Sequence, residues 1–314
     1  MKRKVAATEH GTDTPKAELH VRQSVHGCSS LTRSYCAYPI KFIQHGRNDD
    51  PACLVYVLGF GGGVVSSDVA CMRWILYKHS TLYVKTQGVT KIYKNKFNEK
   101  SIVKLHAKIE DGAMLFNIPE HTSLFKDAHL QMEQYYDILG GGSLVAVDWF
   151  SSGRTESDTN FEVWNLQRLY NRVSISLDGK TVYSEELDLY SSDAIGTVLK
   201  KVGGATIFGS IILAGPKTLA MREEADEVNR RQSFEERKRD IISSRGVSEN
   251  STTGSTFFSE KALVSVSTLT DNLSIIRFAA GRIEDAYYLV NGILKFHPQS
   301  MDKYYIGPKH KNVQ

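Results

Sequence analysis

Seven short apolar runs rich in Val, Ile, Tyr and Phe most strongly constrain how this chain can fold. Each run has the length and the β-branched or aromatic content of a strand, and turn-forming residues lie between the runs. They are CLVYVLG (53–59), STLYVKT (80–86), SLVAVDWF (143–150), RVSISL (172–177), ATIFGSIIL (205–213), KALVSVSTL (261–269) and LSIIRFA (273–279). So many strands predict a mainly β fold, a large multi-stranded scaffold with a few helices.

One pair of strands can be predicted in detail. The segment RVSISLDGKTVYSEEL (172–187) contains two alternating stretches on either side of Asp178-Gly179. This dipeptide readily adopts the positive φ angles that a two-residue hairpin turn requires. We therefore expect an antiparallel hairpin here, with a structural role.

Two segments have the periodicity of a helix. The first, 216–245, opens with a proline suited to a first helical turn and carries interleaved acids and bases with few apolar residues. It is either a solvated surface helix that buries little or an element that faces a partner. The second, 282–297, is amphipathic and is expected to pack on the sheet before Pro298 ends it. Its predicted apolar face consists of Ile283, Ala286, Tyr287, Val290 and Leu294.

The remaining segments indicate one large domain with loose ends. Residues 1–20 are polar and lack periodicity, so we expect a flexible N-terminal tail. Residues 21–300 form the β-rich domain, interrupted at 243–256 by a Ser, Thr and Gly-rich segment that reads as a mobile linker. Residues 301–314 are expected to form a C-terminal tail.

Composition favours an intracellular globular protein. The 314 residues are 41% hydrophobic and 24% charged, and the net charge of +4 neither requires nor excludes an anionic partner. The basic N-terminus has no apolar stretch behind it, and no apolar run is long enough to cross a membrane, so neither a signal peptide nor a membrane partner is expected. The cysteines form no CxxC pair, which favours reduced thiols and a cytoplasmic location. They are Cys28, Cys36, Cys53 and Cys71.

The stretch GFGGGVVSSD (59–68) invites comparison with phosphate-binding loops. A dinucleotide fingerprint needs a third glycine where this chain has Val64 or Ser66, and a P-loop would end in Gly-Lys-Ser/Thr rather than in Asp68. A carboxylate at that position would also repel a phosphate. We therefore expect a structural glycine turn that presents a carboxylate, in which the glycines permit a sharp bend or a close approach of another segment.

Patterns typical of catalysis or of a fixed metal are missing from the sequence. There is no GxSxG elbow and no HExxH pair, which argues against an enzyme. His121 and His129 are more typical of satisfied core or surface groups than of metal ligands. An acid and base pair formed by Asp68 and Asp148 would require a separation and burial suited to proton transfer.

The region 83–108 supports an alternative function. Lysines between Lys85 and Lys108 alternate with Tyr83, Tyr93 and Phe97, a composition that could follow an RNA backbone and stack on bases. Solvated lysines on exposed strand edges explain the same residues more simply. A basic RNA-binding β protein is therefore kept as the alternative hypothesis.

Four motifs in fixed order resemble the urease accessory protein D family (UreD, called UreH in some bacteria), in its eukaryotic form. GGGVVSSD resembles the glycine turn of that family, QGVTKIYK its Thr-Lys-x-Tyr segment, SLFKDA its Leu-Phe-x-x-Ala stretch, and DWFSSGRTES with Phe161 the segment around its Gly-Arg pair. The resemblance extends from about Val25 to His297.

This resemblance implies a mainly β scaffold that is not an enzyme. Family members act with accessory protein F and with the GTPase, accessory protein G, and the complex delivers nickel to apo-urease. The family is thought to pass Ni(II) along an internal path lined in part by acidic side chains, so no permanently bound cofactor and no nucleic acid are implied. The long helix is then a candidate docking element.

The resemblance carries over to this chain only at matching positions. The candidate transient nickel path consists of Asp68, Asp148 and Glu185. The motif positions with a structural part are Gly61, Gly62, Gly63, Thr90, Lys91, Tyr93, Gly153 and Arg154. Carboxylates suit a conduit because oxygen donors hold a late first-row ion more loosely than thiolate or imidazole does.

Simpler roles remain open for each of these residues. Asp68 and Asp148 could instead fix local turns by accepting backbone hydrogen bonds, and Glu185 could be an exposed strand acid. Lys91 and Arg154 could pair with the acids or lie exposed. Two positions depart from the family: Ser67 replaces a glycine, and Asp158-Thr159 stands where Gly-Glu is common, so either Asp158 substitutes for the glutamate or the function is altered.

Overall fold

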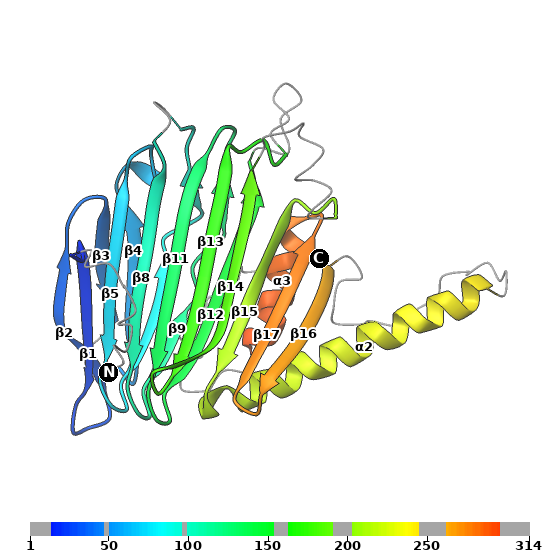
Figure 1. The fold of residues 1–314 in the computed structure, drawn as a ribbon. Helices are drawn as coiled ribbons and strands as arrows, with labels where there is room; N and C mark the ends of the chain where they lie inside the picture. The colour runs from blue at the N-terminus through cyan, green and yellow to red at the C-terminus, as the bar shows by residue number, and fades with distance from the viewer. Residues whose placement is uncertain are drawn as a thin grey trace, which may run out of the picture.

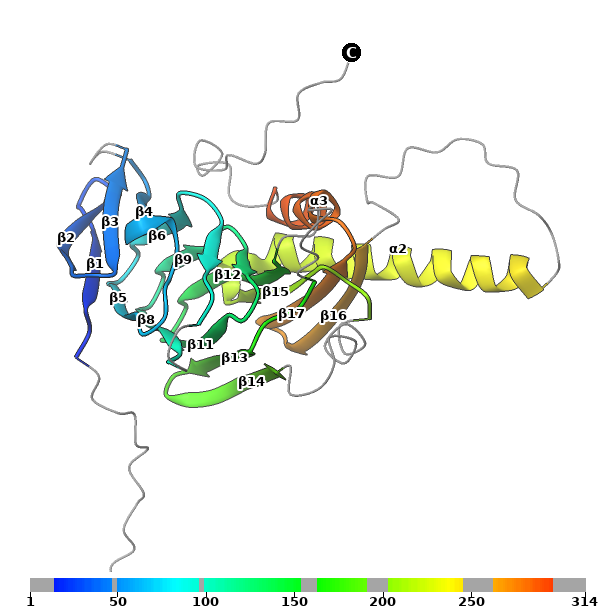
Figure 2. The same cartoon turned by 90° about the horizontal axis from the view of Figure 1, so that it is seen from above.

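The described residues form two facing β-sheets, with the two α-helices of this part of the chain on the outer face of one sheet (Figures 1 and 2). The computed structural model describes residues 14–46, 50–95, 99–153, 163–190, 203–244 and 262–295, and along 232–244 it describes the backbone alone. The predicted mainly β fold is confirmed, and each of the seven apolar runs contains a strand.

The described residues form seventeen strands in two sheets. Sheet A has the order β14, β13, β11, β8, β5, β1, β2, and the main path of sheet B has the order β16, β17, β15, β12, β9, β6, β4, β3. Sheet A comprises β1 (Ala17–Gln23), β2 (Ser29–Cys36), β5 (Val69–Leu76), β8 (Ser101–Ile109), β11 (His129–Ile138), β13 (Arg168–Leu177) and β14 (Lys180–Tyr190). Sheet B comprises β3 (Ile40–His45), β4 (Cys53–Gly59), β6 (Thr81–Thr86), β7 (Thr90–Ile92), β9 (Met114–Asn117), β10 (Thr122–Leu124), β12 (Ser143–Ser152), β15 (Ile207–Ala214), β16 (Ala262–Thr270) and β17 (Leu273–Ala280).

The central part of the chain passes back and forth between the two sheets. Short turns at 77–80, 110–113 and 139–142 join β5 to β6, β8 to β9 and β11 to β12. Within each sheet the strands of successive passes are parallel. Parallel neighbours need a connection that returns the chain to its starting end, and here a strand of the opposite sheet provides it. The two sheets therefore share one interior that is lined from both sides.

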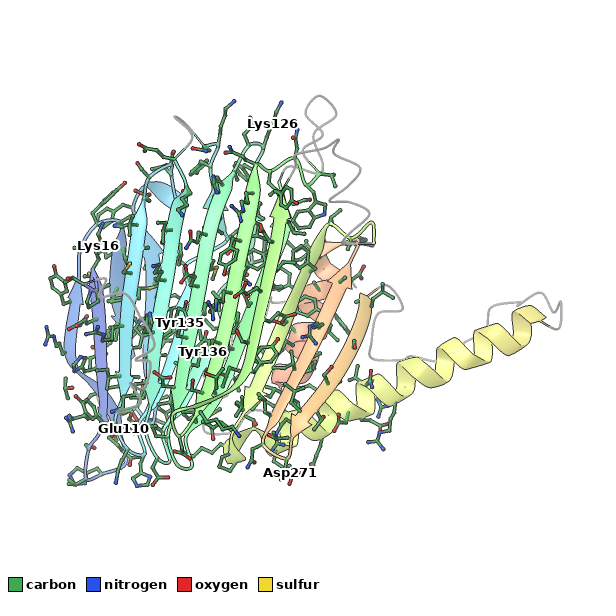
Figure 3. The ribbon with its side chains drawn as sticks, viewed as in Figure 1. Lys16, Glu110, Lys126, Tyr135, Tyr136 and Asp271 are labelled. Carbon is green, nitrogen blue, oxygen red and sulfur yellow. The ribbon has the colours of Figure 1, made fainter. Side chains whose placement is uncertain are left out.

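The short turns stack on one another at one end of the sheets. Ser143 N donates to Ala113 O, and Leu139 N donates to Ile109 O, so each turn is hydrogen-bonded to the previous pass. Gly142 allows this close approach, since a Cβ atom there would lie 2.9 Å from Ile109 O and 3.0 Å from Glu110 O. The side-chain view labels Glu110 at this end and Lys126 at the opposite end of the sheets (Figure 3).

Two apolar clusters fill the interior between the sheets. The cluster at the turn end includes Leu76, Ile109 and Leu144, and the cluster at the opposite end includes Leu130 and Phe150. The clusters draw side chains from both sheets, so burial of this surface is the main force that holds the sheets together. Polar side chains lie between the two clusters.

The predicted hairpin is confirmed. β13 and β14 pair antiparallel, and Asp178 and Gly179 have φ angles of 48° and 80°. These positive values match the twist of a two-residue hairpin turn.

Both predicted helices are present. The C-terminal one, α3 (Ile283–Leu294), buries Ala286 and Val290 of the predicted face and also Leu289 and Ile293 on the outer face of sheet B. It ends before the predicted boundary at 297, and residues beyond 295 lie outside the described part of the chain. The first segment begins with a 3₁₀ turn at Pro216–Thr218 and continues as α2 (Leu219–Ser244).

The helix α2 has two parts with different surroundings. Its first turns bury Met221, Ala225 and Val228 in the cluster shared with α3, so the expectation that it buries little is wrong for this part. Buried Arg222 anchors it by donating to Thr218 Oγ1 and to the carbonyl of Asp271, at the turn between β16 and β17. Beyond these turns the helix continues past the edge strand β16 (Figure 1).

The predicted domain boundaries need two corrections. The predicted N-terminal tail, residues 1–20, is too long, because Ala17–Gln23 form β1, in which Ala17, Leu19 and Val21 are buried. Charged side chains between these apolar ones concealed the alternation. The linker predicted at 243–256 also begins too early, since α2 runs to Ser244. The rest of that linker, residues 1–13 and the tail at 301–314 lie outside the described residues.

None of the helices in the described part of the chain combines the length and the apolar character that a membrane span requires.

Replacing Gly142 with alanine tests the stacking of the turns. A Cβ there meets two backbone carbonyls that cannot move independently, so we expect a loss of about 1–3 kcal/mol in the free energy of unfolding, as for other overpacked sites. Chemical denaturation would measure it. Gly281 is the matched control, because a Cβ there has no neighbour within 4 Å. A Gly142→Ala variant as stable as Gly281→Ala would contradict the stacked arrangement.

Candidate functional site

The described parts of the four sequence motifs, which for the fourth are residues 148–153, come together at the end of the sheets opposite the short turns. Val64 N donates to Lys91 O and Tyr93 N donates to Val64 O, which joins the glycine turn to β7. β7 pairs in parallel with β10, and β10 pairs with the end of β12. Segments far apart in the sequence thus form one continuous backbone ladder.

The glycine turn has the close approach that its composition predicts. A Cβ at Gly63 would lie 2.5 Å from Lys91 O and 2.6 Å from the Tyr93 ring, so only glycine fits against β7 without displacement. Gly61 and Gly62 have φ angles of 75° and 74°, which glycine adopts readily. Ser67 also has a positive φ of 68°, so the turn tolerates a side chain where the family has glycine.

Asp68 fixes this turn. Its side chain is buried, and Oδ2 accepts a hydrogen bond from Val65 N at 3.0 Å. A side-chain hydrogen bond to Asp68 raises the pKa of Tyr38. The turn-fixing role that the sequence left open is therefore present, and it holds the carboxylate immediately before β5.

A cavity of about 360 Å³ lies between the sheets below the glycine turn. Its walls are largely apolar, with Met72, Trp74 and Leu105 among them. The motif residues Gly62, Gly63 and Thr90 line one part of it, and the amide side chains of Asn117 and Gln134 line another. The cavity therefore extends from the glycine turn to the polar side chains between the two apolar clusters.

A group of buried polar side chains, the polar cluster, consists of Asn117, Gln134, Tyr136, Asp148 and Asn171. Asn117 Nδ2 donates to the Tyr136 hydroxyl at 2.8 Å, and that hydroxyl donates to Gln134 Oε1 at 2.7 Å. Asn171 Nδ2 donates to Asp148 Oδ2 at 2.5 Å. Tyr136, labelled on β11 in Figure 3, thus links a cavity-lining residue of each sheet.

Two atoms of the polar cluster are left without a hydrogen-bond partner among the described residues. They are Asn171 Oδ1 and Gln134 Nε2, both fully enclosed. A buried polar atom without a partner costs about 1–3 kcal/mol, so such atoms commonly mark the position of a water or an ion. The unsatisfied amides beside a carboxylate make this the best candidate binding site.

Burial dominates the titration of Asp148. It raises the pKa of this carboxyl group to about 6, and the negative charge of Glu185 raises it too. The Asn171 and Gln134 amides lower the pKa of Asp148. Of these two, Asn171 makes a hydrogen bond to the carboxylate, whereas Gln134 Nε2 lies nearby without a hydrogen bond of standard geometry. Asp148 is therefore electrostatically coupled to Glu185.

A second group, the edge cluster, consists of Tyr183, Glu185 and Arg277. Arg277 Nε lies 3.0 Å from Glu185 Oε1, and the Tyr183 hydroxyl donates to Glu185 Oε2. The cluster joins β14 of sheet A to β17 of sheet B. Glu185 is therefore a partnered, half-buried acid rather than a freely exposed one.

Among the described residues, the basic partner of Glu185 is Arg277, which no motif indicated. Lys91 is exposed on β7, and Arg154 lies outside the described residues. Arg277 was missed because it sits in the apolar run LSIIRFA, where a single arginine resembles a surface position. Gly153 is buried and directly follows β12.

The other sequence candidates have structural roles. Burial lowers the pKa of His121 to about 4, and its ring packs edge-on against Trp149 and Tyr287. His129 is half-buried at the start of β11. Across the described residues, no three His, Cys, Asp or Glu side chains are grouped closely enough to hold a metal ion.

One aromatic residue on which the RNA-binding alternative depends is buried. Tyr83 is 1% exposed and stacks on Phe116, so it cannot stack on a base. Tyr93 packs edge-on against Phe125, and Phe97 lies outside the described residues.

Comparison with known proteins agrees with the motifs. The family described as UreD urease accessory protein matches residues 14–303. Urease accessory protein D of Oryza sativa subsp. indica is 28% identical over 217 residues, 68% of this chain and 70% of that protein. Urease accessory protein D of Arabidopsis thaliana is 25% identical over 272 residues, 85% and 91% of the two chains. A ureD-like urease accessory protein of Schizosaccharomyces pombe is 26% identical over 203 residues, 62% and 69%.

The raised pKa of Asp148 predicts a measurable effect of pH on stability. Because the folded value lies above the unfolded one, the unfolded chain ionises first, and the folded state loses stability as pH rises from about 4 to about 6. The Asp148→Asn variant does not ionise there. Its free energy of unfolding relative to the parent should therefore increase by about 2–3 kcal/mol between these limits.

Denaturation across this pH range would test the effect, with Asp137→Asn, at an exposed position on β11, as the control. A difference between Asp148→Asn and the parent that stays constant with pH would show that Asp148 is not buried as described.

Proposed function

The chain belongs to the UreD family of urease accessory proteins, and from that premise we propose that it is a scaffold that passes Ni(II) to apo-urease. Its general role is urease maturation. We propose further that it binds accessory protein F, together with the GTPase accessory protein G, and apo-urease, that it is not itself an enzyme, and that Ni(II) crosses it along an internal path without residing there as a cofactor.

The cavity and the polar cluster carry this proposal. The cavity extends from the motif segments to Asn117 and Gln134, and these amides belong to the same buried group as Asp148. Asp148 Oδ2, Asn171 Oδ1 and the Tyr136 hydroxyl are oxygen atoms in one enclosed region. A hydrated divalent cation would satisfy the amide oxygen that lacks a partner.

The chemistry of these groups suits passage more than storage. Ni(II) is held tightly by thiolate and imidazole, whereas a carboxylate, amide oxygens and water hold it less strongly. An ion on a path must leave as well as enter, which limits the useful strength of each site. A single carboxylate with neutral oxygen donors fits this requirement.

The three candidate acids would act at different places. Asp68 lies at the glycine turn, beside the part of the cavity that Gly62 and Gly63 line. Asp148 lies in the polar cluster, and Glu185 lies in the edge cluster within electrostatic reach of Asp148. We propose that Asp148 is the main ion contact and that Asp68 acts chiefly by holding the turn in shape.

The helix α2 is the proposed docking element for accessory protein F. It is anchored on sheet B by Met221, Ala225 and Val228 and then extends past β16 (Figure 1). Leu219 at its start is 53% exposed. Among the described residues, Cys28, Cys36, Cys53 and Cys71 form no disulfide, which supports work in the reducing cytoplasm.

Substitution of the acids tests the proposed path. The variants are Asp148→Asn, Asp68→Asn and the double Asp68→Ala, Asp148→Ala variant, expressed in cells that lack the native factor. Loss of the charged oxygen donor should lower urease activation by Asp148→Asn about tenfold or more, the size typical for residues that tune a metal site. Urease activity and the nickel content of purified urease are the two measurements.

Asp137→Asn serves as the matched control, because this acid is exposed on the outer face of β11. Co-purification with accessory protein F tests the scaffold separately and should survive the Asp148→Asn change. Full activation by the double variant would eliminate the acidic path and leave the scaffold. Failure of the unsubstituted protein to co-purify with accessory protein F or urease would eliminate the scaffold.

A further inference from the structure

Arg277 holds the carboxylate of Glu185 at the edge of the space between the sheets. Its Nε lies 3.0 Å from Glu185 Oε1, and its NH2 group lies 3.3 Å from the Tyr183 hydroxyl. Tyr183 in turn donates to the second oxygen of Glu185. Each oxygen of this acid therefore accepts a hydrogen bond and its charge is paired with Arg277, so an incoming cation must compete with the guanidinium for Glu185.

The arginine faces the same interior as Asp148. In the register of sheet B, Asp148 is opposite Ser210 and Ser210 is opposite Arg277. Residues directly opposite one another project from the same face of a sheet, so the three side chains form one row. The Cα atoms at its ends are about 10 Å apart, since neighbouring strands are spaced by roughly 4.8 Å. The small side chain of Ser210 lies between the two charged ones.

The charges along this row favour the exchange of one cation, the Arg277 guanidinium, for another, a divalent metal ion. The row and Glu185 together hold two carboxylates and one guanidinium, and the charge of Glu185 already acts on Asp148. A divalent ion that entered beside them would be repelled by Arg277 and attracted by both acids. The position of the Arg277 guanidinium therefore affects how strongly a divalent ion is held here.

The Glu185–Arg277 pair is placed so that it can open. The side chains of Arg277 and Glu185 are 42% and 39% exposed, so water can solvate each of them when they separate. Pairs with this exposure are held weakly compared with buried ones. The guanidinium can therefore move toward solvent without leaving a charge unsolvated in the interior.

We propose that Arg277 is an internal competitor for the travelling ion: it occupies Glu185 when the path is empty, yields when Ni(II) arrives from Asp148, and returns to help the ion leave. This inference rests on the proposed function and adds the group that limits how strongly the path holds nickel. In this step Glu185 exchanges its contact with the Arg277 guanidinium for a contact with Ni(II), and no covalent bond changes.

Nickel affinity of the full-length protein tests the role of Arg277. The Arg277→Gln variant keeps a shorter, hydrogen-bonding side chain and lacks the positive charge. Equilibrium dialysis against NiSO₄ should show about five- to tenfold tighter binding than in the parent, because the repulsion is removed and Glu185 is freed. Adding Glu185→Gln to this variant should abolish the gain, and Arg277→Lys, which keeps the charge, should bind as the parent does.

A second arginine–carboxylate pair, within the β13–β14 hairpin that carries Glu185, provides the matched control. Arg168 contacts Asp188 through two hydrogen bonds of 2.9 and 2.8 Å, with side-chain exposures of 46% and 38%. This pair lies on the outer face of sheet A, since Leu169 and Leu187 beside it point into the interior. Arg168→Gln should leave nickel affinity unchanged, whereas equal gains in both variants would show a general charge effect and overturn the inference.

The outcomes separate this inference from the proposed function. Unchanged affinity in Arg277→Gln, together with weaker binding in Asp148→Asn, would overturn the role of Arg277 and leave the path intact. Unchanged affinity in Asp148→Asn would count against the path itself. Thermal melting establishes that each variant is folded. If Arg277→Gln does not fold, Tyr183→Phe removes one group that orients the guanidinium, and unchanged affinity in that variant would overturn the inference.

Discussion

The buried carboxylate of Asp148 imposes the central constraint on this structure, because it lies between two apolar clusters and requires polar interaction partners there. Desolvation of such a group is costly unless hydrogen bonds or a cation compensate it. Asn171 donates a hydrogen bond to Asp148, and Asn117, Tyr136 and Gln134 from both sheets form a hydrogen-bonded chain in the same buried group. The interior is therefore divided into two apolar parts with a polar part between them, and the cavity reaches that polar part.

The fold class and several elements could be predicted from the sequence because their signals are local. β4, β12 and β17 are long apolar runs, and the hairpin at Asp178-Gly179 has a specific turn dipeptide. The glycine turn was also interpreted correctly as a place of close backbone approach, which the contact of Gly63 with β7 explains. The outer strands of sheet A were harder, since in β1 charged side chains alternate with buried Ala17, Leu19 and Val21.

The back-and-forth path and the polar cluster could not be predicted, because they depend on which segments become neighbours. The turns at 77–80, 110–113 and 139–142 occupy equivalent places but share little sequence, so no repeat is visible in the letters. Asn171, Gln134 and Arg277 lie on three different strands, and nothing local distinguishes them from surface residues. The motifs identified Asp148 as a candidate, but the polar side chains around it are determined by the packing of the two sheets and could not be predicted.

Anomalous scattering at the nickel absorption edge, from crystals of the full-length protein grown with Ni(II), tests the central claim most directly. We expect a peak in the interior between the sheets, about 2 Å from a carboxylate oxygen of Asp148, as is usual for oxygen ligands of late divalent metals. Nickel found only at surface histidines, with water alone in the polar cluster, would contradict the account.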